Sequence, residues 1–348
     1  HKAIDLLSDS WLPWLVVIPG LLIGLVFGAI PGLSIPVAMA VFLPLTVHMD
    51  FLSAVLFLTS IFTGGGFGGA IPAILMNIPG TGSAVATAFD GYPMAQQGKH
   101  SLALGIGLAA STIGTGFGYL VLMLFVSPMA EAVLHLGPFE MFMVAMWGLT
   151  LIAVLGSKSL SKGLLAGMAG VLISTIGMGA QGDERGTFGS VYLLDGIPAV
   201  PALIGLFAAS ELFRLLGQDY IVSDKTKRRM SFRDILAGAK LSIRHPMTLI
   251  RGSVIGVVIG AIPGVGSSVS NLVSYSSEKR RAKDSSQFGH GDPRGVAAAE
   301  SANSSSEGGS MATLLALGIP GGAATAVMLG AFAMHNITGG SRFMAENM

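Results

Sequence analysis

The distribution of charged residues constrains this chain more than any other feature. Five stretches contain no Asp, Glu, Lys or Arg, and each has at least 26 residues: 10–49, 51–89, 101–130, 252–277 and 308–341. A helix needs roughly 20 apolar residues to cross a bilayer, so each stretch is long enough to do so. Charged residues make up 11% of the chain, against about 25% in soluble domains. We therefore predict an all-α polytopic membrane protein embedded in the lipid bilayer, because helices satisfy their own backbone hydrogen bonds there.

Net charge and cysteine content exclude several other classes. The formal net charge is +1, which leaves no basic footprint for binding nucleic acid. The chain has no cysteine, and therefore no disulfide, iron–sulfur cluster or thiolate metal site. We expect no nucleic-acid partner and no cofactor.

The basic residues predict which side of the membrane the loops occupy. Thirteen of the 20 Lys and Arg residues lie between Lys225 and Arg294, in one cluster before and one after the uncharged stretch 252–277. Both clusters are cytoplasmic by the positive-inside rule. Pro263 and Gly264 divide the stretch into arms of about 11 to 13 residues, which reach roughly 17 to 20 Å and cannot cross a core of roughly 30 Å. We predict a re-entrant hairpin whose tip lies near the middle of the membrane.

An internal repeat supports this interpretation. The sequence GLVFGAIPG at Gly24–Gly32 recurs as GVVIGAIPG at Gly256–Gly264, and each copy is followed by an Ile-Pro-Gly, at 78–80 and 319–321. The loop after the first copy, 48–50, has no Lys or Arg, whereas the loop after the second copy has four. Opposite charge at equivalent positions indicates an inverted repeat. The alternative is chance recurrence in a chain with 49 glycines, since GxxxG alone also marks helix packing.

The Pro-Gly breaks are candidate ligand sites, because a broken helix is tolerated at membrane depth only where it is buried in protein or lines a cavity. At each Ile-Pro-Gly the first half-helix ends in free carbonyl groups, at Asn77 and Gly318, which suit a cation such as Na⁺. The second half-helix begins with free N–H groups, at 81–83 and 322–325, which suit a carboxylate.

Two acidic residues stand in the polar stretch 300–307 before the second Ile-Pro-Gly. If this stretch is helical, Glu300, Asn303 and Glu307 share one face. Acidic residues inside a membrane are candidates for binding or exchanging a cation or a proton. The alternative is a solvated cytoplasmic loop or helix surface.

The motifs together resemble the large membrane subunit of the tripartite tricarboxylate transporter family, the TctA type. They extend over nearly the whole chain: GAIPG at 28–32, AILMNIPG at 73–80, FDGYPMAQQG at 89–98, GDERGTFG at 182–189, GIPAVPALIGLFAASE at 196–211, GAIPG at 260–264, GVAAAESAN at 295–303 and LGIPG at 317–321.

The resemblance implies a multi-pass subunit of the bacterial inner membrane that imports citrate or a related carboxylate. It implies cation symport, with Na⁺ as the expected coupling ion, and a small membrane subunit (TctB type) and a periplasmic solute-binding protein (TctC type) as partners. It also implies an elevator mechanism and a family fold that continues past Met348, so that either the chain is cut short or its end was not observed.

Combining the breaks with the resemblance, we assign two sets of site residues. The substrate-binding set is Asn77, Thr81, Gly82, Ser83, Asp90, Ser267, Gly321, Gly322 and Thr325. The ion-binding set is Asn77, Asn271, Glu300, Asn303 and Gly318.

We divide the chain into a first repeat (1–128), connecting spans with a basic loop (129–247) and a second repeat (248–348). Two other functions compete with transport. A channel would share the glycine-rich re-entrant loops but conduct without a binding protein. An intramembrane hydrolase needs two catalytic groups at one depth, and the sequence offers no such pair. We therefore predict a transporter and not an enzyme.

Overall fold

The computed structural model describes residues 12–135, 137, 139–140, 142–143, 146, 160–178, 183–194, 196–197, 205, 230–337 and 339–340. Most of the motif at 196–211 and the basic residues from Lys225 to Arg229 lie outside this part of the chain. So does much of the predicted connecting region 129–247.

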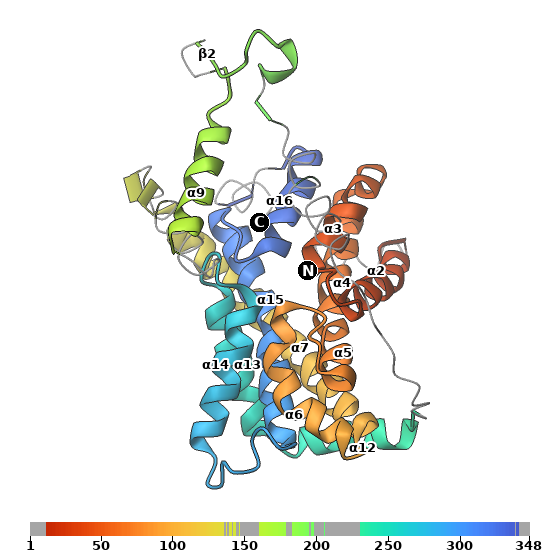
Figure 1. Cartoon of the computed structure of the whole chain (residues 1–348). Helices are drawn as coiled ribbons and strands as arrows, with labels where there is room; N and C mark the ends of the chain where they lie inside the picture. The colour runs from red at the N-terminus through yellow and green to blue at the C-terminus, as the bar shows by residue number, and fades with distance from the viewer. Residues whose placement is uncertain are drawn as a thin grey trace.

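The described chain is almost entirely helical (Figure 1). The first half contains α2 (Leu12–Ala29), α3 (Ile35–Phe42), η1 (Leu43–His48), α4 (Phe51–Gly68), α5 (Ala70–Met76), η2 (Gly82–Ala84), α6 (Val85–Gln96) and α7 (His100–Leu134). Next come α9 (Leu160–Ser174), the antiparallel strands β1 (Gly177–Met178) and β2 (Glu184–Arg185), and η3 (Val191–Leu193). The last part contains α12 (Phe232–Ile243), α13 (Pro246–Gly260), α14 (Gly266–Arg281), α15 (Pro293–Leu317) and α16 (Ala323–Met334). Both predicted domain boundaries fall inside helices, α7 and α13.

Two segments are long and apolar enough to cross a bilayer, Phe51–Met76 in α4 and α5 and His100–Met129 in α7. The outer side of α7 exposes large apolar side chains, including Met123, Leu124 and Phe125. Exposed apolar area of this extent is unusual for a soluble protein and suits contact with lipid. The helical content and these apolar helices confirm the predicted all-α class.

The most enclosed helix, α15, is also among the most polar. Every residue from Gly295 to Leu314 is buried, including Glu300 and Glu307. It packs against α7, α13 and α14, which lie around it in Figure 1. Asp292 caps its first turn by accepting a hydrogen bond from the N–H of Arg294 at 2.8 Å. The polar stretch 300–307 is therefore a buried helix, and the alternative of a solvated surface is wrong.

The hairpin of α13 and α14 has longer arms than the sequence predicted. The break falls at 261–265 as expected, but the two helices have 15 and 16 residues. Each helix extends beyond the uncharged stretch 252–277. Pro246 starts α13 at a position where proline is favoured, and the basic residues 279–281 continue the last turn of α14, where positive charge stabilises a helix.

Glycine contacts recur in the two halves of the chain. A Cβ atom added to Gly24 or Gly28 on α2 would lie 2.1 or 2.5 Å from the carbonyl oxygen of Ile61 or Gly65 on α4. On α13, a Cβ added to Gly256 or Gly260 would lie 2.3 Å from the carbonyl oxygen of Ala302 or Ser306 on α15. The residue numbers of the corresponding glycines in the two halves differ by 232 in both cases, and those of the carbonyl residues they approach differ by 241. Hence α2 packs on α4 in the same register as α13 packs on α15.

The largest apolar cluster joins α3, α4 and α16. Its fully buried members include Met39, Leu58, Met328 and Phe332. Because α3 and α16 both pack on α4, this cluster joins the two short helices to the longer one.

Candidate functional site

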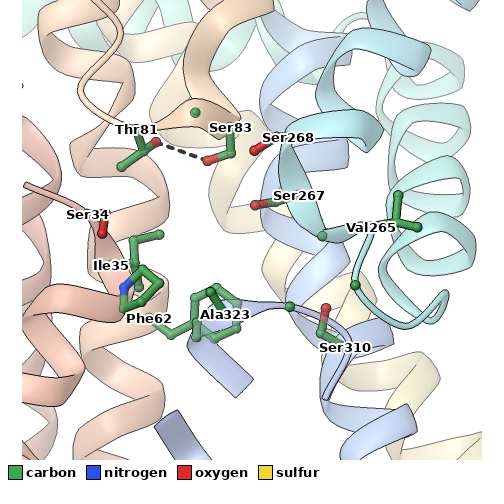
Figure 2. Close-up of a pocket in the computed structure, with 16 residues that line it drawn as sticks. Ser34, Ile35, Phe62, Thr81, Ser83, Val265, Ser267, Ser268, Ser310 and Ala323 are labelled. Atoms are coloured by element: carbon green, nitrogen blue, oxygen red, sulfur yellow. Dashed lines mark hydrogen bonds between the residues drawn. The ribbon is translucent and has the colours of Figure 1, made fainter. Parts of the chain in front are cut away.

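A cavity of about 280 Å³ lies where four chain breaks meet (Figure 2). Three residues come from each of the starts of α3, η2 and α16, five from the turn into α14, and one each from α4 and α15. The lining residues are Ser34, Ile35, Pro36, Phe62, Thr81, Gly82, Ser83, Gly264, Val265, Gly266, Ser267, Ser268, Ser310, Gly322, Ala323 and Ala324. Both halves of the chain therefore contribute to one site.

Local backbone geometry produces the breaks. The helices α5 and α15 end at Asn77 (φ 59°) and Gly318 (φ 71°), both in the left-handed conformation that commonly terminates a helix. After each Ile-Pro, the glycine packs directly on backbone: a Cβ on Gly80 would lie 2.0 Å from the carbonyl oxygen of Gly28, and one on Gly321 would lie 2.6 Å from that of Gly260. Glycine is thus required at both turns, and the next helix starts beside the cavity.

The chemistry of the lining suits an anion. None of the lining residues is charged, and the starts of α3, η2 and α14 have no side-chain cap. Unpaired N–H groups and the positive end of the helix dipole attract carboxylates and phosphates at such positions. Hydroxyl groups supply further hydrogen bonds. The Oγ1 atom of Thr81 and the Oγ atom of Ser83 lie 3.0 Å apart. Figure 2 shows these two residues on the side of the cavity nearest Ser267 and Ser268.

Five of the predicted substrate residues line the cavity: Thr81, Gly82, Ser83, Ser267 and Gly322. The other four do not line it. Gly321 is buried against Gly260, and Thr325 bonds the start of its own helix, accepting from the N–H of Gly322 at 3.0 Å. Asn77 is exposed at the end of α5.

Asp90, another predicted substrate residue, does not line the cavity. Its Oδ1 atom accepts hydrogen bonds from the N–H groups of Gly289, Gly291 and Asp292 at 2.8–2.9 Å. The side chain is fully buried, away from the cavity. It ties α6 to the loop that precedes α15, and so holds the two halves of the chain together.

Three of the predicted ion-binding residues come together in the interior rather than at the cavity. Asn271 accepts from the N–H of Ala86 at 2.8 Å and donates to the carbonyl of Ala299 at 3.2 Å. Glu300 accepts from the hydroxyls of Thr87 and, at 2.9 Å, Ser111. Asn303 donates to the carbonyl of Gly66 at 3.1 Å. Gly318 lies apart from them, at the end of α15.

Several lining residues were absent from the predicted set. Ser34, Ile35 and Pro36 follow the first GAIPG at the place where Gly266 and Ser267 follow the second. Ser267 was assigned to the substrate site, so its counterparts in the first repeat could have been assigned as well. Phe62 and Ser310 come from the middle of helices and carry no comparable sequence signal.

We predict that Gly322→Leu abolishes carboxylate binding without unfolding the protein. Gly322 has extended backbone (φ −165°), and the only atom near an added Cβ is the Cα of Gly266, at 3.6 Å. A leucine side chain can therefore enter the cavity without displacing backbone. Radiolabelled citrate binding to the purified protein measures the loss. Gly322→Ala is the matched control and should keep most of the binding; equal affinity in wild type and Gly322→Leu would place the substrate elsewhere.

A helical membrane protein with an uncharged, hydroxyl-bearing cavity between broken helices has the architecture of a solute transporter. The chain belongs to the tripartite tricarboxylate transporter TctA family, whose model matches residues 14–348. This confirms the resemblance seen in the motifs. It also confirms that the chain is a transporter component and not an enzyme.

Two proteins of Agrobacterium vitis are similar to this chain. One is an uncharacterized 52.8 kDa protein in the TAR-I ttuC' 3' region, 34% identical over 322 residues, which are 92% of this chain and 64% of the relative. The other is an uncharacterized protein in the TAR-II ttuC' 3' region, 42% identical over 85 residues, which are 24% of this chain and 35% of the relative. The chain thus spans less than two thirds of the length of either relative. No solved structure matches it.

Proposed function

We propose that this chain belongs to the large membrane subunit of a binding-protein-dependent importer of citrate or a related carboxylate. The observation that carries the proposal is the uncharged cavity formed by four chain breaks, where N–H groups and hydroxyls meet. A carboxylate bound by backbone dipoles can be released again more readily than one paired with a buried Arg.

We further propose that transport is coupled to a cation, with Na⁺ as the expected ion, and that the two halves of the chain form an inverted repeat. The glycines of α2 contact α4 in the same pattern as the glycines of α13 contact α15, and this recurrence supports the repeat. A pair of inverted repeats around one midplane site is typical of secondary transporters that work by alternating access. An elevator movement of the hairpins against a scaffold fits this arrangement.

The proposed partners are a small membrane subunit and a periplasmic solute-binding protein, and the proposed location is the bacterial inner membrane. The test is uptake into liposomes that contain the full-length large subunit and its small subunit, with a citrate-loaded binding protein outside. We expect uptake to require both the binding protein and an inward Na⁺ gradient. Equal citrate flux without the binding protein would favour a channel instead.

Asn303→Ala is expected to weaken cation coupling while leaving the amount of folded protein unchanged. Asn303 donates one hydrogen bond to the carbonyl of Gly66 on α4, and the alanine variant loses a polar ligand from the interior rather than a packed apolar group. The net stability change for one hydrogen bond is about 1 kcal/mol. The dependence of uptake on Na⁺ concentration measures the effect. An unchanged dependence in the variant would remove Asn303 from the ion site.

A further inference from the structure

Two buried carboxyl groups lie on α15 away from the substrate cavity. Glu300 is 0% and Glu307 is 1% exposed, and neither lines the cavity. Their partners are uncharged: hydroxyl groups and, for Glu300, also the Asn303 amide. Thr87 and Ser111 donate to Glu300, and Thr63 donates to Glu307 at 2.8 Å.

The other buried acids in the described part of the chain have stronger partners. Glu278 pairs with Arg251 at 3.1 Å, and Asp292 pairs with Arg294 at 2.6 Å. Asp90 accepts three backbone N–H bonds. An ionised carboxylate buried with uncharged partners alone costs several kcal/mol, so Glu300 and Glu307 are most stable with a proton bound.

The helices packed against α15 bring almost no charge to these two groups. Those helices are α4, α6, α7, α12, α13, α14 and α16, together with η2. Their titratable residues in the described range are Asp90, Tyr92, His100, Tyr119, Glu131, Arg233, Asp234, Lys240, Arg251, Tyr275, Glu278, Lys279, Arg280 and Arg281. In the described range no basic residue forms an ion pair with Glu300 or Glu307, and Tyr119 lies beside Glu307. The Tyr119 hydroxyl is buried beside Thr63 and Glu307 without a hydrogen bond of normal geometry.

A crevice of about 580 Å³ between α2, α4 and α7 ends at hydroxyl groups that contact both carboxyl groups, although neither carboxyl group lines it. Its polar lining is Thr63, Ser111, Thr112 and Thr115, and the rest is apolar apart from Gly64. Thr63 and Ser111 are the hydroxyls that donate to Glu307 and Glu300, so one side chain separates each carboxyl group from the crevice. A proton can pass along these hydroxyls. A hydrated metal ion would have to displace them.

Hydrogen bonds also connect Glu300 to the helices that start at the substrate cavity. Thr87 belongs to α6, and it accepts from the amide of Asn271 on α14 at 3.4 Å. Asn271 in turn accepts from the N–H of Ala86. A change in the charge of Glu300 therefore acts on both α6 and α14.

We propose that Glu300 and Glu307 take up and release protons through the crevice between α2, α4 and α7, and form a proton site distinct from the substrate cavity. On uptake a carboxylate accepts one proton from hydronium and leaves water; on release the carboxyl group gives the proton back to water, which becomes hydronium. If the proposed function holds, these protons contribute to the driving force in addition to Na⁺.

The transport test uses liposomes with the full-length large subunit, its small subunit and a citrate-loaded binding protein. Na⁺ is equal on both sides and the membrane potential is clamped. For each coupled proton, a gradient of one pH unit raises the accumulation ratio of citrate about tenfold. Under a gradient of one pH unit, we expect the accumulation ratio of citrate to be about tenfold lower in Glu300→Gln, and about tenfold lower in Glu307→Gln, than in wild type. The matched control is Glu278→Gln, a buried acid with a basic partner, which should respond like wild type. An undiminished response to the pH gradient in both Gln variants would overturn the proposal.

A second measurement does not depend on transport. Infrared spectra of the purified protein in lipid, recorded across a pH titration, report the C=O stretch of protonated carboxylic acids. We expect bands that titrate in wild type and are lost one by one in the two Gln variants. If uptake fails under every gradient but these bands titrate, the proposed function is wrong and the proton site stands. If uptake requires only Na⁺ and neither band appears at any pH, the proton site is wrong and the proposed function stands.

Discussion

Gly256→Val is expected to prevent the protein from folding in the membrane. The Cβ of any replacement would lie 2.0 Å from the Oγ of Ser305 and 2.3 Å from the carbonyl oxygen of Ala302. The second of these atoms is backbone, so relief requires α13 to move away from α15. Overpacking of a well-packed core typically costs about 1–3 kcal/mol, and we expect this variant to reach or exceed the upper value because two helix backbones are in contact. The yield of monodisperse protein after extraction in detergent, with its melting temperature, measures the loss.

The control for this variant is Gly116→Val on α7, where an added Cβ has nothing within 4 Å. Replacing glycine in a helix is neutral or stabilising by a few tenths of a kcal/mol when no neighbour is in the way. Gly24→Val should fail as Gly256→Val does, since its Cβ would lie 2.1 Å from the carbonyl oxygen of Ile61. Normal yield of both variants would show that the close packing of α2 on α4 and of α13 on α15 is not needed.

The helix breaks could be predicted because they depend on a few neighbouring residues. Pro263 is followed directly by Gly264, which adopts φ 77°, and this pair ends a helix locally; Gly321 serves a turn that the local sequence Ile-Pro-Gly already specifies. The five predicted residues that line the cavity all adjoin such breaks. The exact helix lengths could not be predicted from charge, because α13 and α14 tolerate basic residues at the ends that approach water.

The partners of buried polar residues could not be predicted. Asp90 sits three residues after Thr87, on what looks like one face of the helix that leaves the cavity, yet its hydrogen-bond donors are 199 to 202 residues away in sequence. Similarly, the stretch 300–307 has the composition of a solvated surface. It is buried because α7 and α13 approach α15 at glycines, for example at Gly114 and Gly252, whose added Cβ atoms would meet the backbone of Ser301 or Ala298. Such contacts join distant segments and leave no pattern within either one.

The sharpest test of the cavity compares Ser267→Asp with Ser267→Asn. Ser267 lines the cavity at the start of α14 and is only partly buried, so both side chains have room, and they differ by one negative charge. Two like charges about 4 Å apart repel by about 4 kcal/mol near a protein surface. We therefore expect Ser267→Asp to weaken citrate binding by about a thousandfold.

The Asp side chain is also favourable for folding, because a negative charge near a helix N-terminus stabilises the helix by roughly 0.3–1 kcal/mol. Ser267→Asp should consequently be at least as stable as wild type while losing binding, and Ser267→Asn should bind within about tenfold of wild type. Calorimetric titration of the purified Asp and Asn variants with citrate measures the two affinities. Equal affinity of the Asp and Asn variants would mean that no anion approaches α14, and the cavity would then not be the carboxylate site. Weaker binding by the Asp variant alone requires the anion to lie at the helix starts, because no charged side chain lines the cavity to account for the difference.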